Sequence, residues 1–187
     1  MQLAPGTEIA ADSLHFQSGE AVAANPVVLS MQSAANIAVE VGVIDGAPGA
    51  ATRVLSEKGF ASGAPTPSDH GSAVASLLRS AGVTRIRVAD VYGEDPAGGN
   101  ALAIARALGW LTRSGSKVVT ISLVGPRNAL VERAVAAARA RGVVVVAAVG
   151  NDGPAAPPAY PASYEGVVAV TGVDRRNRAL IEAGRAL

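Results

Sequence analysis

Short apolar runs that alternate with helix-length segments are the feature of this sequence that most restricts its fold. Residues 37–44, 83–91, 117–123, 143–149 and 167–173 are rich in Val and Ile and have the length of β-strands. Helical patterns occupy residues 70–79, 100–113 and 129–141, and Ser68, Asn100 and Gly142 stand where helix caps are expected. Strands that alternate with such helices imply right-handed βαβ units. We therefore predict a three-layer α/β/α fold with a mainly parallel sheet, in which residues 143–149, apolar on both faces, form a central strand.

The start of the chain lacks this alternation. Residues 1–36 are mixed and polar, so we interpret them as a weakly structured lead-in to a domain that spans residues 37–187. Residues 46–67 are rich in Gly, Pro and Ser and are predicted to form a long loop. No basic region followed by an apolar stretch opens the chain, so it shows no signal peptide, and we expect an excised piece of an exported, periplasmic or secreted protein.

Composition excludes several classes of function. The formal net charge is +1 and Lys and Arg form no cluster, so we expect no nucleic-acid partner. The longest apolar run, residues 143–149, is far too short for a membrane span. The chain has no cysteine, which excludes disulfides and thiolate metal sites. No loop rich in carboxylates indicates a calcium site, so we expect neither metal nor cofactor.

Polar side chains follow three of the predicted strands. Asp45, Ser122 and Asn151 fall at carboxyl ends of strands, where sites gather in parallel sheets. Alone, Asp45 could orient an imidazole, bind a metal or cap a turn, and Asn151 could form a turn or donate a hydrogen bond to an oxyanion. His70 begins a predicted helix and is followed by Gly71 and other small residues that permit close approach of a backbone or substrate.

Together these segments resemble the motifs of the subtilisin-like serine proteases (subtilases, peptidase S8). Residues 41–46 (Val-Gly-Val-Ile-Asp-Gly) are similar to the aspartate motif, and residues 70–76 (His-Gly-Ser-Ala-Val-Ala-Ser) are similar to the histidine motif. Residues 119–126 resemble the substrate-binding strand, and residues 143–153 resemble the region of the oxyanion asparagine. The order of aspartate before histidine is that of subtilisin. The resemblance extends from about residue 37 to residue 179.

This resemblance implies a role for each matching residue. His70 would be the general base, Asp45 would fix its tautomer, and Asn151 would stabilise the oxyanion. An extended polypeptide substrate would pair with the backbone of the substrate-binding strand. That strand comprises Ser122, Leu123, Val124 and Gly125, and the wall of the pocket comprises Ala147, Ala148, Val149 and Gly150.

The nucleophile is missing from this pattern. The family's Gly-Thr-Ser-x-Ala motif occurs nowhere in the 187 residues. We therefore expect a catalytic domain that is incomplete at its C-terminus and inactive alone. Val124 stands where the family usually has glycine, and Ala73 where it often has a second histidine.

Two other functions remain open from the sequence. A non-catalytic peptide-binding module would use the same groove. A nucleotide-binding α/β domain is weakly indicated by residues 46–49 (Gly-Ala-Pro-Gly) and by Asp90 near the end of a strand, but the chain has no G-x-G-x-x-G motif.

Overall fold

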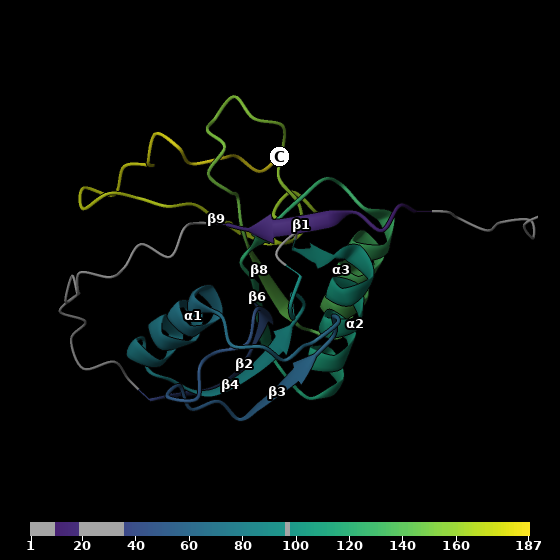
Figure 1. Cartoon of the computed structure of the whole chain (residues 1–187). Coiled ribbons are helices and arrows are strands. Elements are labelled where there is room, and N and C mark those ends of the chain that lie inside the picture. Colours follow the sequence, from purple (N-terminus) through teal and green to yellow (C-terminus); the bar gives the residue numbers. More distant parts are fainter. Residues whose placement is uncertain (1–9, 19–35, 96–97) are drawn as a thin grey trace, which may run out of the picture.

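A six-stranded parallel sheet runs through the centre of the chain (Figure 1). The computed structural model describes residues 10–18, 36–95 and 98–187. The strands lie in the order β3-β4-β2-β6-β8-β9, and each neighbouring pair is parallel. Their bounds are β2 Ile37–Asp45, β3 Ser56–Gly59, β4 Val83–Asp90, β6 Val118–Ile121, β8 Val144–Ala148 and β9 Val168–Val170.

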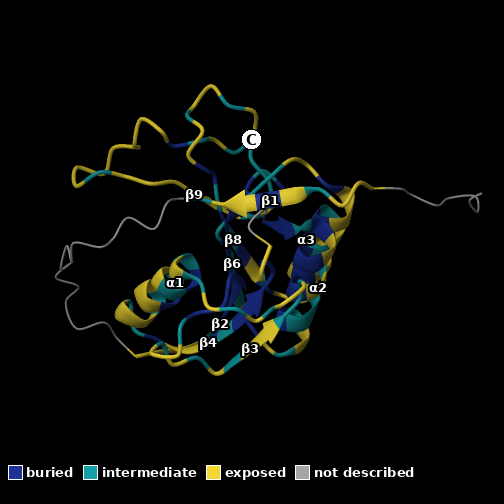
Figure 2. Cartoon of the chain, viewed as in Figure 1, coloured by how far each residue is buried: buried dark blue, intermediate teal, exposed yellow. Residues whose placement is uncertain are grey.

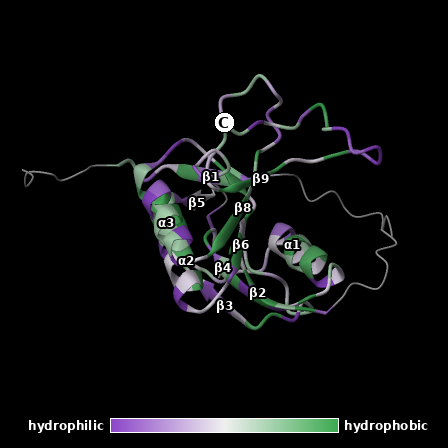
Figure 3. Ribbon diagram, turned by 180° about the vertical axis from the view of Figure 1, so that it is seen from behind, coloured by the Kyte–Doolittle hydropathy of each residue, from purple (hydrophilic) through white to green (hydrophobic). Residues whose placement is uncertain are grey.

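Helices cover both faces of this sheet. Helix α1 (Asp69–Ser80) packs on β2 and β4 from one side, whereas α2 (Ala101–Arg113) and α3 (Ala129–Ala140) pack on each other and on the opposite face (Figure 3). The predicted three-layer α/β/α fold is therefore confirmed. In the part of the chain that the structure describes, no helix is both long and apolar enough to cross a bilayer.

The predicted helix caps are also confirmed. The Ser68 hydroxyl accepts a hydrogen bond from the backbone N–H of Gly71 at 2.9 Å at the start of α1. The Asn100 side chain does the same for Ala103 at the start of α2, at 2.7 Å. Gly142 has a φ of +79°, the left-handed conformation that commonly ends a helix. Each cap satisfies a backbone group that the helix leaves unpaired.

The larger part of the core lies between the main sheet and helices α2 and α3, and a smaller cluster lies on the other face, where Val74 and Leu78 of α1 pack (Figure 2). Residues 41–45 of β2 are all buried, and Ile44 has no exposed surface. A Cβ atom added to Gly42 would lie 2.9 Å from both δ carbons of Leu111. The missing side chain at Gly42 therefore lets α2 approach the sheet closely, which fixes the strand that ends in Asp45.

The prediction that residues 143–149 form a central strand is wrong. Strand β8 lies next to the edge strand β9, and its Val144 is 47% exposed. Helix α3 covers one face of β8, but α1 packs on β2 and β4, away from its other face. The apolar run therefore predicted a strand of this sheet, but it did not predict the position of that strand in the strand order.

A second, smaller sheet was not predicted. Strands β5 (Gly99–Asn100), β1 (Leu14–Gln17) and β7 (Leu123–Val124) lie in that order, and both pairings are antiparallel. Within the predicted lead-in, residues 1–36, the structure describes residues 10–18, which include β1, and residue 36, and the remainder lies outside the described part. Strand β3 was also missed, because residues 56–59 (Ser-Glu-Lys-Gly) carry no apolar pattern.

Candidate active site

Asp45 and His70 meet at the carboxyl end of the main sheet. Asp45 is the last residue of β2 and is fully buried, while His70 is in the first turn of α1. The His70 Nδ1 atom lies 2.9 Å from Asp45 Oδ1 and 2.8 Å from Oδ2. Because an ionised carboxylate can only accept, Nδ1 carries the hydrogen. In the neutral ring, Nε2 then has a free lone pair.

Backbone contacts hold this pair in place. The backbone N–H of Gly46 donates to Asp45 Oδ1 at 2.7 Å. A Cβ atom on Gly71 would come 2.1 Å from the carbonyl oxygen of Gly46, so only glycine permits α1 to lie this close to the end of β2. The Ser72 hydroxyl donates to the carbonyl oxygen of Ser68 and accepts from the N–H of Gly49. The small residues after His70 thus bring the helix within reach of Asp45.

The pair also shifts the ionisation of both side chains. The hydrogen bond with Asp45 raises the pKa of His70 above its ordinary 6.5, against the effect of burial. Burial raises the pKa of Asp45, and the hydrogen bonds from His70 and from the N–H of Gly46 oppose this rise. His70 is therefore a stronger base than a free imidazole.

A segment of the chain itself lies beside His70. Strand β1 pairs with β7, with Phe16 opposite Val124, and the N–H of Ser18 donates to the carbonyl oxygen of Ser122 at 2.8 Å. The carbonyl oxygen of Ser18 lies 3.4 Å from His70 Nε2. The strand predicted to bind an extended peptide is therefore paired with one, and a peptide carbonyl faces the imidazole.

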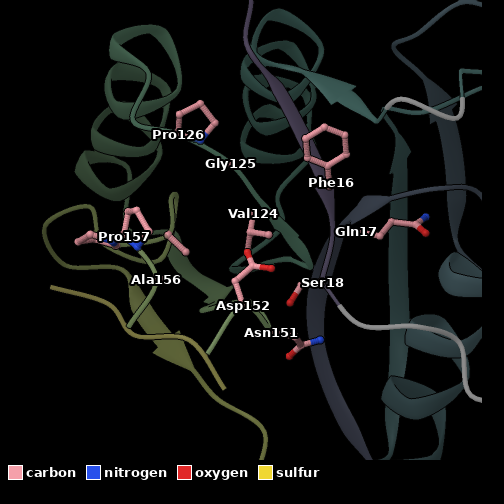
Figure 4. Close-up of a pocket in the computed structure, with 12 residues that line it drawn as sticks. Phe16, Gln17, Ser18, Val124, Gly125, Pro126, Asn151, Asp152, Ala156 and Pro157 are labelled. Atoms are coloured by element: carbon pink, nitrogen blue, oxygen red, sulfur yellow. The ribbon is translucent and has the colours of Figure 1, made fainter. Parts of the chain in front are cut away.

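A cavity of about 600 Å³ opens next to Ser18 (Figure 4). Val124, Gly125, Asn151 and Asp152 line it together with residues 16–18, 126 and 156–159. Asn151 and Ser18 thus share one cavity, at the end of β8.

Other residues predicted for the site lie deeper. Leu123 has no exposed surface, and Ala147 and Val149 also belong to the core. Gly150 lies behind Val124, because a Cβ atom on Gly150 would come 3.2 Å from the Val124 Cγ1 atom. Ala147, Ala148, Val149 and Gly150 are not among the described residues that line this cavity.

No pattern in the sequence indicates that residues 13–18 belong to this site. His15 was interpreted as part of the lead-in, and the four-residue alternation Leu-His-Phe-Gln is too short to predict a strand. Pairing with β5 and β7 defines this strand, and those partners are far away in the sequence.

The groups that suggested a nucleotide site are occupied by internal hydrogen bonds. Asp90 is buried, and its carboxylate accepts from the N–H groups of Thr66, Tyr92 and Gly93 at 2.7–2.9 Å. The Gly49 N–H is bonded to Ser72. Neither group is directed at a ligand, which disfavours a dinucleotide site.

Comparison with known proteins shows the family of the chain. The sequence profile of the peptidase S8 subtilase family matches residues 51–183. The chain belongs to the subtilase family. It is 37% identical over 131 residues to Subtilisin Savinase from Lederbergia lenta, an alignment that covers 63% of this chain and 48% of the relative. The alignments of this subtilase chain cover between 30% and 48% of the length of such curated relatives.

Other relatives agree with this assignment. The subtilase chain is 43% identical over 82 residues to Subtilisin DY from Bacillus licheniformis, covering 41% of this chain and 30% of the relative. Its fold is similar to that of the prenylagaramide maturation protease PagA, with a TM-score of 0.68 and 21% identity over 79% of this chain and 58% of the other. At that identity the likeness shows the fold alone.

Proposed function

We propose that this chain supplies the general base, its orienting carboxylate and the peptide groove of a subtilisin-like serine endopeptidase. The Asp45–His70 pair, with Nε2 facing the carbonyl oxygen of an extended peptide segment, is the observation that carries the proposal. His70 takes the proton from a serine hydroxyl and returns it to the leaving amine, while Asp45 holds the tautomer and stabilises the imidazolium.

The oxyanion and the substrate are assigned to neighbouring residues. The Asn151 side-chain amide donates a hydrogen bond to the tetrahedral oxyanion, and its place in the same cavity as Ser18 supports this role (Figure 4). The backbone of Ser122, Leu123 and Val124 pairs with the substrate, as it pairs with residues 16–18, and Gly125, whose backbone is hydrogen-bonded to Tyr160, lines the adjoining cavity. Ala147, Ala148, Val149 and Gly150 are assigned to the wall of the pocket that holds the residue before the cleaved bond.

The nucleophile is the part that these 187 residues do not contain. No Gly-Thr-Ser-x-Ala motif is present, so in this proposal the serine comes from a segment that the sequence does not include. The chain alone then has a base without a nucleophile and hydrolyses no peptide bond at an appreciable rate.

A fluorophosphonate, which reacts with activated serines, tests the proposal. We expect no labelling of the 187-residue chain, and stoichiometric labelling of a chain extended through its serine segment. In the extended chain, His70→Ala should abolish labelling. Stoichiometric labelling of the 187-residue chain at any serine would contradict the proposal. An extended chain that binds peptides but never reacts with the probe would instead be the non-catalytic peptide-binding module.

A further inference from the structure

Asp90 ends strand β4 beside the carboxylate that orients His70. Strands β2 and β4 are parallel neighbours in the main sheet, and Asp45 lies opposite Asp90 in their register (Figure 1). Neither residue has any exposed surface. The N–H of Val91 donates to the carbonyl oxygen of Asp45 at 3.0 Å, which holds the two strand ends together. A second buried carboxylate, with no part in the proposed reaction, therefore lies next to the Asp45–His70 pair.

The Asp90 carboxylate is satisfied by three backbone groups. Its Oδ2 atom accepts from the N–H of Thr66 at 2.7 Å, and its Oδ1 atom accepts from the N–H groups of Tyr92 and Gly93, both at 2.9 Å. Among the described residues, no Lys, Arg or His forms an ion pair with it. A carboxylate only accepts hydrogen bonds, whereas an amide of the same shape would turn its own NH2 group toward at least one of these donors. Both oxygens of Asp90 are therefore needed at this position.

Asp90 joins both ends of a loop to the main sheet. The N–H of Phe60, directly after β3, donates to the Asp90 carbonyl oxygen at 2.8 Å, and the N–H of Thr66 donates to its carboxylate. Between them, the carbonyl oxygen of Ser62 accepts from the N–H of Glu94 at 3.2 Å. The point at which this loop leaves the sheet toward α1 is thus set by one buried side chain.

The path from Thr66 to His70 is short and is held by Ala47. Pro67 forms a β-bridge with Ala47, and the N–H of Ser68 donates to the Ala47 carbonyl oxygen at 2.8 Å. Ser68 is in turn the N-cap of α1. The hydrogen bond between Thr66 and Asp90 is therefore the last described one to β4 before the helix that carries His70.

The helix itself contributes few large side chains to the core. Gly71 and Ala75 are the only fully buried residues of α1, and Val74 and Leu78 are partly buried against the sheet. Small side chains allow close approach but make few dispersion contacts that would resist a small displacement. The backbone contacts that precede the helix must therefore fix the position of its first turn.

We propose that Asp90 is a positioning residue for the general base, and that it acts on His70 through Thr66. The role rests on the proposed function, because it takes His70 to be the general base. Asp90 contacts neither the substrate nor the imidazole in this role, and it sets where the first turn of α1 lies relative to Asp45. The chemical step depends steeply on such placement, since a displacement of about 1 Å can slow a reaction on the order of 10²-fold.

Asp90→Asn tests this role in the 187-residue chain, with His15→Gln as the background so that one imidazole remains. The readout is the proton NMR resonance of the His70 Nδ1–H, which is hydrogen-bonded to Asp45. We expect this proton to exchange with water at least about tenfold faster in Asp90→Asn, because the hydrogen bond to Asp45 loosens. Asp45→Asn is the positive control, since it removes the carboxylate that accepts this hydrogen bond.

Asp174→Asn is the matched negative control. The Asp174 carboxylate also accepts from backbone N–H groups, those of Arg176 and Arg178 at 2.7 and 3.0 Å, but it does so in a surface turn that follows β9. Exchange of the His70 proton should be unchanged in this variant. The comparison separates loss of any carboxylate that caps a turn from loss of the one that is linked to α1.

A second variant removes only the link between Asp90 and Thr66. An ester in place of the amide between Pro65 and Thr66, made by incorporating the α-hydroxy acid that corresponds to threonine, deletes the N–H and keeps Asp90 with its charge. We expect the same acceleration of His70 proton exchange as in Asp90→Asn, because both changes break the same hydrogen bond. If Asp90→Asn fails to fold, as urea unfolding would reveal, the ester variant decides.

Kinetics of the chain extended through its serine segment provide a readout that a merely structural role would not move. In Asp90→Asn, kcat per site labelled by the fluorophosphonate should fall by about tenfold or more, while KM stays within about twofold. A misplaced base slows the chemical step without changing how peptides pair with the groove. A merely structural Asp90 would lower the fraction of labelled sites but leave kcat per labelled site unchanged.

The outcomes separate this role from the proposed function. If Asp45→Asn accelerates exchange of the His70 proton but the ester variant does not, Asp90 does not act through Thr66 and only the positioning role is overturned. An unchanged kcat per labelled site in Asp90→Asn would overturn it as well. If Asp45→Asn itself leaves the His70 proton unchanged, the Asp45–His70 pair of the proposed function fails, and the positioning role with it.

Discussion

The imidazole of His15 occupies the space that a side chain on Gly125 would need. An added Cβ would lie 2.6 Å from the ring, closer than carbon atoms in proteins approach. Because Gly125 also lies directly after β7, this contact joins the predicted substrate strand to the segment that fills its groove.

Gly125→Ala should therefore expel β1 from the groove. We expect amide hydrogens of residues 14–18 to exchange faster in this variant by at least about tenfold, while those of β2 stay protected. Gly49→Ala is the matched control, since its Cβ would lie at an ordinary 3.5 Å from the Ser72 hydroxyl. Unchanged protection of residues 14–18 in Gly125→Ala would show that His15 does not fill this space.

Docking of β1 should weaken as the pH falls. Burial lowers the pKa of His15 below its ordinary 6.5, while its contact with the carbonyl of Ser13 and the charge of Asp12 oppose this shift. Strands β5 and β7 carry no titratable side chain. The undocked strand therefore binds more protons, so docking is fully favourable above pH 6.5 and is lost as the pH falls toward the lowered pKa.

Protonation of His70 should favour the docking of β1, which is opposite to the effect of protonating His15. A variant separates the two effects. The pKa of His70 is raised, and its protonated Nε2 can donate to the carbonyl oxygen of Ser18, which favours docking at lower pH. His15→Gln keeps His70 but removes the His15 titration. Hydrogen exchange of residues 14–18 at pH 7.5 and 5.5 should show less acid-induced loss of protection in His15→Gln than in the unmodified chain. Equal losses would contradict this prediction.

Close packing behind Asp45 should make Gly42 intolerant of any side chain. Gly42→Ala would place a Cβ 2.9 Å from the buried Leu111, and we expect it to lower the free energy of unfolding by about 1–3 kcal/mol. Urea unfolding measures this change. The Gly42→Ala, Leu111→Ala double variant should lose less than the sum of the two single variants, because the second change removes the clash. Additive losses would show that the two positions are not coupled.

The strands of the main sheet could be predicted from the sequence because the patterns that specify them lie within short segments of the chain. An apolar run specifies a strand, and a cap specifies the start of a helix, through residues that are close together in the sequence. Examples are the runs before Asp45 and Asn151 and the caps Ser68 and Asn100. The position of β8 next to the edge strand β9 could not be predicted, because it is set by pairing with β6 and β9, which are separate segments of the sequence.

The occupied groove could not be predicted for a different reason. Strand β1 exists because its backbone pairs with residues more than 80 positions away, at Gly99 and Val124. Its one buried side chain is a histidine, which a hydrophobic pattern cannot detect. The pairing of Asp45 with His70 was an expectation of family resemblance, and in the structure the glycine at position 71 brings the two side chains together.

An NMR titration of His70 tests most directly whether Asp45 makes this imidazole a base. The chain has two histidines, so in a His15→Gln background one imidazole remains to be observed. We predict a His70 pKa above 6.5, and a lower pKa when Asp45 is changed to Asn, because the carboxylate that stabilises the imidazolium is lost. A His70 pKa that stays the same in Asp45→Asn would contradict it.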